Sequence, residues 1–123
     1  MNTDELSIAA TDNRAAFRPG ETVEFSALWA LQKKPATVDA RLFWFTRGKG
    51  TEDVGVIATQ SAPTAEAAGE YLFHFTLPHA PYSFSGRLIS LLWAVELEAG
   101  GRSARQEFTL APGAREIVLL AGK

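Results

Sequence analysis

The stretch that decides the fold is RLISLLWAVELEAGGRSARQEFTL, residues 87–110. In its first half every second residue is apolar, so a strand over Arg87–Ala99 would present one apolar face, made of Ile89, Leu91, Trp93, Val95 and Leu97. Gly100-Gly101 separates this run from a second alternating run, Arg102–Leu110. Because both central positions of a type I′ turn need positive φ, the glycine pair predicts a tight antiparallel hairpin.

The same period of two recurs on both sides of this hairpin, between Gly, Pro and polar clusters. The expected strands are Leu6–Ala10, Thr22–Leu31, Thr37–Thr46, Asp53–Gln60, Glu70–Leu77 and Glu116–Leu120. Pro19-Gly20 predicts a β-turn before the second of them, and residues 61–68 are expected to form a loop with one helical turn. The pattern contains no amphipathic helix and therefore predicts an all-β fold, a two-sheet antiparallel immunoglobulin-like sandwich of about 7–8 strands.

Composition limits the chemistry that the chain can perform. It has 123 residues, with 12 Lys and Arg against 14 Asp and Glu, and no cysteine. A chain of this length buries roughly two-thirds of its unfolded surface, which is enough for one core without disulfides or metal. The absence of cysteine excludes disulfide scaffolds, thiolate metal sites and cysteine nucleophiles. We expect residues 1–123 to form a single domain, and the net charge of −2 lacks the positive excess of a nucleic-acid binder.

Targeting signals and membrane segments are not evident. Residues 1–8 include Asp4 and Glu5 and lack the basic and apolar regions of a secretory signal. The longest wholly apolar runs, such as Ala27–Leu31 and Leu91–Val95, have five residues, far fewer than the ~20 that a spanning helix needs. We therefore expect no membrane span and a cytoplasmic protein.

Three motifs give the chain a family resemblance. GEYLFHFTLP (residues 69–78) is an aromatic-rich strand that follows a glycine and ends in Leu-Pro, and PYSFSG (residues 81–86) leads into the strand centred on Trp93. Upstream, FRPGETV (residues 17–23) holds a Pro-Gly-Glu turn that opens an early strand. Over residues 17–110 the chain resembles the arrestin N-terminal-type domain, although other immunoglobulin-like sandwiches share such turns and corners.

The resemblance implies an immunoglobulin-like sandwich that acts as an adaptor or scaffold, with no catalytic residues to carry over. Arrestin-like proteins usually contain two such sandwiches, whereas this chain has room for one and resembles a small, single-domain, bacterial relative. The chain also lacks a Pro-Pro-x-Tyr motif and a basic cluster resembling a phosphate sensor, because Lys33 and Lys34 stand alone.

One strand has an unusual second face. If Leu42 and Trp44 point into the core, Asp39, Arg41, Phe43 and Phe45 point outward, and Arg47 continues the alternation. In an immunoglobulin-like arrangement the neighbouring strand adds three apolar residues to that face, Leu88, Leu92 and Ala94. An exposed patch of this size is typical of an interface. We take Arg41, Phe43, Phe45, Leu88 and Leu92 as candidate protein-interaction residues, for a partner or for self-association.

Other interpretations of that face remain open. A β-bulge could shift the register, because a slip of one residue exchanges the two faces, or a terminal segment could cover the phenylalanines. Aromatic rings flanked by arginine also occur in single-strand nucleic-acid binders, but those proteins normally add a basic groove.

Candidate catalytic or metal-binding groups are sparse. His79 lies near Ser83 and Ser85, but a nucleophilic serine also needs an orienting group and an oxyanion site, and turn capping explains these serines more simply. His74 is expected on the solvent side of its strand, and Glu96 and Glu98 on the polar part of a strand face. We expect no catalytic residues, no metal and no cofactor.

Three functions compete at this level. The first, which we favour by elimination and resemblance, is a non-enzymatic protein-interaction module of adaptor or scaffold type. The second is a small-ligand or carbohydrate-binding β-sandwich, whose sign would be exposed aromatic residues such as Tyr82 and Phe84 in the 79–86 loop. An enzyme, the third, would need a polar constellation that the sequence does not offer.

Overall fold

The computed structural model describes residues 4–50, 52–86, 88–113 and 117–118, and these contain ten strands and no helix. The strands are β1 (Glu5–Ala10), β2 (Ala16–Phe17), β3 (Thr22–Ala30), β4 (Thr37–Gly48), β5 (Val54–Pro63), β6 (Ala68–Thr76), β7 (Phe84–Ser85), β8 (Ile89–Ala99), β9 (Arg102–Leu110) and β10 (Ile117–Val118). Among these residues no helix is long and apolar enough to cross a membrane. The predicted all-β class is confirmed, with the two-residue strands β2, β7 and β10 raising the strand number slightly above the expected one.

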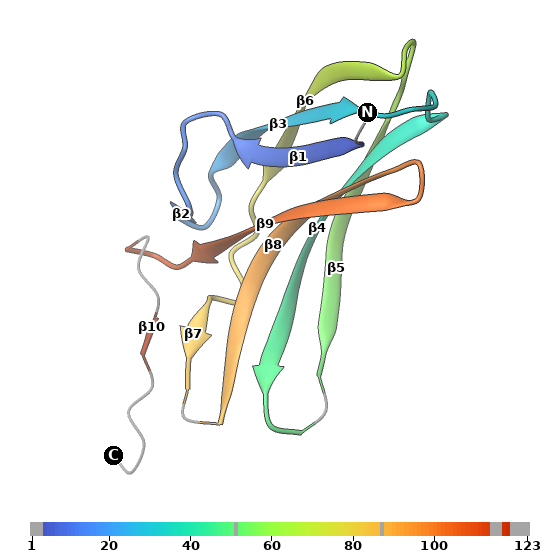
Figure 1. The fold of residues 1–123 in the computed structure, drawn as a ribbon. Helices are drawn as coiled ribbons and strands as arrows, with labels where there is room; N and C mark the ends of the chain where they lie inside the picture. The colour runs from blue at the N-terminus through green and yellow to red at the C-terminus, as the bar shows by residue number, and fades with distance from the viewer. Residues whose placement is uncertain (1–3, 51, 87, 114–116, 119–123) are drawn as a thin grey trace.

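The strands form two sheets that pack as a sandwich (Figure 1). The first sheet has the antiparallel order β1-β3-β6. The second is built around β8, which pairs along one edge with β4 and along the other with β9 and then β7. β5 pairs with β4, β10 with β7, and β2 with β9. This arrangement makes β5 the last strand on its side of the second sheet.

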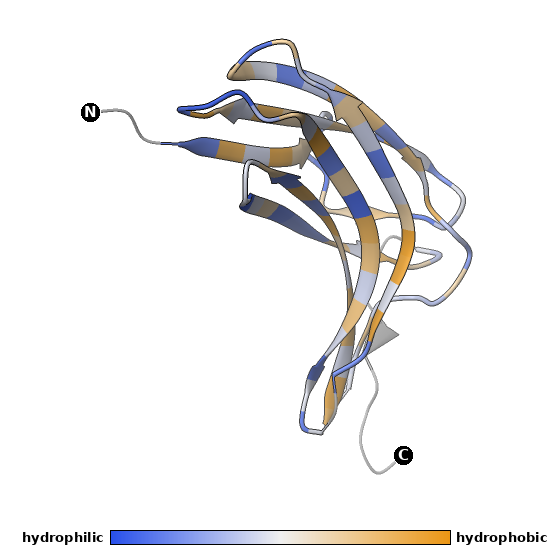
Figure 2. Cartoon of the chain, turned by 90° about the vertical axis from the view of Figure 1, so that its right-hand side faces the viewer, coloured by the Kyte–Doolittle hydropathy of each residue, from blue (hydrophilic) through white to orange (hydrophobic). Residues whose placement is uncertain are grey.

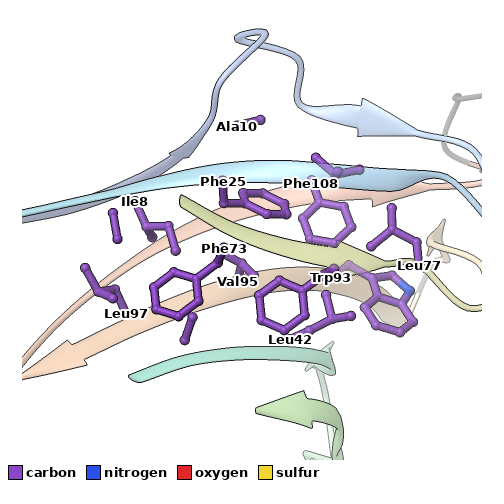
Figure 3. Close-up of a cluster of buried hydrophobic side chains, with 14 of the residues drawn as sticks. Ile8, Ala10, Phe25, Leu42, Phe73, Leu77, Trp93, Val95, Leu97 and Phe108 are labelled. Carbon is purple, nitrogen blue, oxygen red and sulfur yellow. The ribbon is translucent and has the colours of Figure 1, made fainter. Parts of the chain in front are cut away.

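The core lies between the two sheets and follows the predicted alternation (Figure 3). Val23, Phe25, Ala27 and Trp29 of β3 are buried, as are the inward residues of β8 from Leu91 to Leu97. Aromatic rings from both sheets meet there: Phe25 of β3 lies 6.3 Å from Phe108 of β9 between ring centroids, and Phe108 stacks against Trp93 of β8 at 6.2 Å. Such ring contacts add to the stabilisation that comes from burying apolar surface.

Both predicted turns are present. Gly100 and Gly101 have φ of 59° and 79°, which are the positive values that a two-residue hairpin requires. Gly20 has φ of 84°, and the Glu21 amide donates to the Arg18 carbonyl at 3.2 Å, which closes the turn before β3.

Some expectations need correction. The helical turn predicted within residues 61–68 is wrong, because β5 continues to Pro63 opposite Thr37 and β6 begins at Ala68. Ile89, placed on the apolar face of the strand over Arg87–Ala99, is exposed, since it lies at the end of β8 beyond the first sheet. The predicted strand 116–120 lies mostly outside the described residues, apart from β10.

The second sheet extends beyond the first. In Figure 1 the lower ends of β4, β5 and β8, together with β7, continue well past β1, β3 and β6, and Figure 2 shows this extension from the side, with hydrophobic positions along it. We call this part the projecting sheet, which comprises residues 43–48, 54–57, 84–86 and 88–92. At its upper margin Leu91 is part of the core and Trp44 and Phe84 pack against it. Beyond that margin no strand of the first sheet lies over the projecting sheet (Figure 1), so its side chains are covered by other means or remain exposed.

Candidate protein-interaction surface

The Phe43 and Phe45 side chains lie on the outer face of β4, where alternation predicts them. The pairing of β4 with β8 runs without a break, so that Phe43 lies opposite Ala94 and Phe45 opposite Leu92. A register shift does occur on the other side of β4: Leu42 pairs with Ala58 and Phe43 with Val56, which leaves Ile57 of β5 without a partner. This bulge leaves the register between β4 and β8 unchanged, so the phenylalanines stay on the outer face.

Arginine side chains cover the two rings. The guanidinium carbon of Arg105, on β9, lies 5.2 Å from the Phe43 ring centroid and 5.3 Å from that of Phe45. Arg47 approaches Phe45 at 5.4 Å, and the two rings lie 5.8 Å apart. A guanidinium over an aromatic face is attracted by the ring quadrupole while its polar edge stays hydrated.

Carboxylates fix these arginines in place. Glu96 of β8 lies 3.5 Å from Arg105 and 3.9 Å from Arg41, and Glu107 of β9 lies 3.0 Å from Arg47. The two Glu96 distances follow from the register, which aligns Arg41, Glu96 and Arg105 in one row across β4, β8 and β9. Positive charge on this face is therefore balanced by carboxylates, unlike the basic groove of a single-strand nucleic-acid binder.

The candidate residues consequently differ in accessibility. Only 5% of the Phe43 side chain is exposed, and Arg41, Phe45 and Leu92 are half-buried. Leu88 is 63% exposed and precedes β8, where its carbonyl accepts a hydrogen bond from the Lys49 amide. The structure thus places Arg41, Phe43, Phe45 and Leu92 together and Leu88 apart from them. The expected continuous patch of exposed apolar side chains is wrong, because arginine covers its centre.

The exposed apolar side chains of the projecting sheet lie elsewhere. They are Val54 (62% exposed), Val56 (53%) and Ile57 (44%) on β5, with Leu88 and Ile89 at the start of β8. Sequence reasoning placed a strand over Asp53–Gln60 but singled out none of these β5 residues. Val54 and Val56 alternate as expected for a strand. At the bulge, however, the consecutive residues Val56 and Ile57 are both exposed, which interrupts the alternation of apolar and polar residues.

A shallow hollow of about 310 Å³ opens beside the arginine-covered rings. Phe43 and Phe45 line it together with Arg47 and Arg105 on one side and Val54 on the other. The hollow therefore connects the covered face with the exposed strand β5.

The serine and histidine candidates have structural surroundings. Ser83 is 2% exposed, and its hydroxyl oxygen accepts a hydrogen bond from the Leu110 amide at 2.9 Å. The Ser83 amide in turn donates to the Leu110 carbonyl at 2.7 Å, so this residue joins its loop to the end of β9 rather than capping a local turn. His79 packs instead against the turn at Gly20, where its ring lies about 3 Å from the position that a β-carbon would occupy.

The remaining polar candidates form surface pairs. His74 is exposed on β6 and lies 2.9 Å from Glu24 of β3, directly across the sheet. Glu96 is occupied by arginines, as described above. Within the described residues, no group of three or more His, Cys, Asp or Glu side chains is placed to hold a metal ion.

The chain is similar to known proteins in its fold. No family model matches the chain, and no curated protein matches it. The sporulation control protein Spo0M from Bacillus subtilis is similar in structure, with a TM-score of 0.57 over 90% of this chain and 50% of that one, at 16% identity. A β-glucosidase from Listeria innocua, solved with isofagomine, gives 0.50 over 95% of this chain and 17% of the enzyme, at 14% identity.

These identities are low enough that the likeness concerns architecture alone, and the chain spans only half the length of Spo0M. Together with the all-β topology, the likeness supports the arrestin-like sandwich that the motifs at residues 17–110 predicted. The fold is an arrestin-like, immunoglobulin-like β-sandwich with an extended second sheet.

Proposed function

We propose that this chain is a non-enzymatic protein-interaction module of adaptor or scaffold type, which binds its partner through the projecting sheet. The observation that carries the proposal is the presence of several exposed apolar side chains on a part of the second sheet that no strand of the first sheet covers (Figure 1). Val54, Val56 and Leu88 are each more than half exposed there. Water-exposed apolar side chains that gather at one site, with charged groups beside them, are typical of interfaces.

The polar groups of the chain support a binding role more than a catalytic one. The Ser83 hydroxyl is engaged by the Leu110 amide, and the outer-face glutamates are engaged by arginines. Neither set leaves a nucleophile beside a free base, which acyl-transfer chemistry requires. We also propose a cytoplasmic location, with which the absence of cysteine is compatible.

A photocrosslinking experiment tests the interaction role. A photoreactive phenylalanine analogue is placed at Leu88, on the projecting sheet, and as a matched control at Leu28, which is 47% exposed on the outer face of β3. In living cells of the source organism we expect discrete adducts from position 88 and none of the same mass from position 28. Adducts that are absent at 88, or identical at both positions, would contradict the proposal.

A second candidate function rests on Tyr82. This residue is 37% exposed in the loop before β7, whereas its companion Phe84 packs against the core. One exposed aromatic ring is a weaker saccharide platform than two. Titration with a panel of oligosaccharides, comparing the wild type with Tyr82→Ala, distinguishes the two functions: saturable binding that the substitution removes would favour the ligand-binding alternative.

A further inference from the structure

β5 presents an open edge. It pairs with β4 along one side, and in the described part of the chain no strand pairs with its other side. In its C-terminal half, the side-chain amide of Gln60 donates a hydrogen bond to the His74 carbonyl of β6 at 2.6 Å. The segment Val54–Thr59, whose first four residues belong to the projecting sheet, therefore keeps a row of backbone donors and acceptors that another extended strand could satisfy in register.

The composition of this edge favours pairing. From Val54 to Ala62 the strand contains neither a charged residue nor a proline, and β-branched residues prevail in its exposed part. Natural proteins usually protect open edges with charges, prolines or a covering segment. The other long edges have such protection: β6 carries Glu70 and His74, and the Ala10 amide of β1 donates to the Gln106 side chain of β9.

We propose that β5 pairs antiparallel with β5 of a second copy of this chain, about a two-fold axis near Val56. This inference rests on the proposed function and names the partner of the same surface. Pairing of this kind joins two second sheets into one continuous sheet and brings Val56 of one copy beside Val56 of the other. Cross-strand contacts between β-branched side chains stabilise such a pair.

The charges next to the edge favour the antiparallel direction. Glu52 and Asp53 precede β5, whereas residues 59–61 near its other end are neutral. In the antiparallel arrangement the carboxylates of each copy lie opposite the neutral residues 59–61 of the other. A parallel arrangement would set like carboxylates side by side, which is destabilising. A second copy can therefore pair with this edge in the antiparallel direction without placing like charges together.

The bulge keeps the interface small. Ile57 interrupts the regular pairing of β5 with β4, and a bulge twists an edge strand locally. Regular pairing between copies is therefore short, and the interface belongs at the low end of the size range, among transient complexes. We expect a reversible monomer–dimer equilibrium that depends on protein concentration, rather than a permanent dimer.

Sedimentation of purified protein tests the arrangement. The wild type is measured from about 10 µM to about 500 µM, a range suited to transient complexes. Its average mass should rise toward twice the 13.3 kDa of one chain. Val56→Lys should remain at one chain mass, because two ammonium groups would meet at the axis, and the matched control Leu28→Lys should behave like the wild type. Circular dichroism verifies that each variant is folded.

A charge-exchange mixture makes the test independent of any loss of folding. Val56→Asp should also remain monomeric, but an equimolar mixture of Val56→Asp and Val56→Lys should dimerise again, because the two-fold axis places opposite charges together. A wild type that stays monomeric, a Val56→Lys protein that still dimerises, or a mixture that does not dimerise would overturn the proposal. Crosslinking at Leu88 is read separately, because it reports any protein that contacts the projecting sheet in cells: adducts at Leu88 without dimers of the purified protein would overturn the second-copy proposal and leave the proposed function standing.

Discussion

At the scale of single residues, Arg105 explains how a strand can carry phenylalanine on its solvent side. Its guanidinium lies over the Phe43 and Phe45 rings while Glu96 holds it from the next strand. The aliphatic part of the side chain shields apolar surface, and its charged end remains in water. Because Arg105 covers them, the phenylalanines on the outer face of β4 expose little apolar surface to other molecules.

Removal of this cover should be measurable. We expect Arg105→Ala to lower the free energy of unfolding by about 1 kcal/mol, since cation–π contacts at exposed sites contribute about 0.5–1 kcal/mol. Arg105→Lys should recover only part of the loss, because an ammonium group cannot stack as a planar guanidinium does. Urea unfolding of these variants in a double-mutant cycle with Phe43→Leu isolates the contact. Strictly additive effects would show that Arg105 and Phe43 do not interact.

Asp4 gives a pH-dependent prediction. The Gln32 backbone amide, which donates to its carboxylate at 2.9 Å, and the Arg102 guanidinium at 2.6 Å hold the pKa of Asp4 below its usual range. A lowered pKa in the folded state means that the stabilisation is present at neutral pH and is lost as pH falls through that pKa. The difference in unfolding free energy between wild type and Asp4→Asn should therefore be positive at pH 7 and shrink in acid. A difference that grows in acid would contradict this.

At the scale of elements, two strand glycines lie opposite tryptophans. Gly55 of β5 pairs with Trp44 and Gly69 of β6 with Trp29, and in each case the indole ring occupies the space above the glycine. A β-carbon at Gly55 would lie 2.2 Å from the Trp44 ring. These strands therefore need glycine for close approach and not for a turn.

Gly55→Ala should for this reason destabilise the protein. Displacing a packed indole costs about 1–3 kcal/mol, as overpacking does elsewhere. Gly113 is a suitable control, because nothing lies within 4 Å of the position that its β-carbon would take, and Gly113→Ala should be neutral to within about 0.5 kcal/mol. Thermal unfolding of both variants decides the question, and equal melting temperatures would show that the ring moves aside without cost.

Much of the hairpin β8–β9 was predictable from sequence, and so was one of its ion pairs. A two-residue turn at Gly100-Gly101 fixes the register, so that Glu96 must lie opposite Arg105. The approach of Arg105 to Phe45 could not be predicted, because the register of β4 against β8 is set by tertiary packing over a long sequence separation. The open edge of β5 was equally inaccessible, since alternation predicts a strand but not its position in the sheet.

At the scale of the whole molecule, the sandwich and the projecting sheet have different roles. The sandwich contains the aromatic core, which forms without disulfides. The projecting sheet has one face covered by arginine and one open edge, β5, that nothing in the described chain pairs with. We propose that binding belongs to this projecting part of the fold rather than to the sandwich core.

Residue-resolved amide hydrogen exchange, recorded at low and high protein concentration, tests this central claim most directly. If β5 edges pair, amides within Val54–Thr59 that point away from β4 should exchange more slowly as concentration rises, because they acquire acceptors in the second copy. Amides on the open edge of β6, the matched control, should exchange at the same rate throughout. Exchange in Val54–Thr59 that does not depend on concentration would contradict the account.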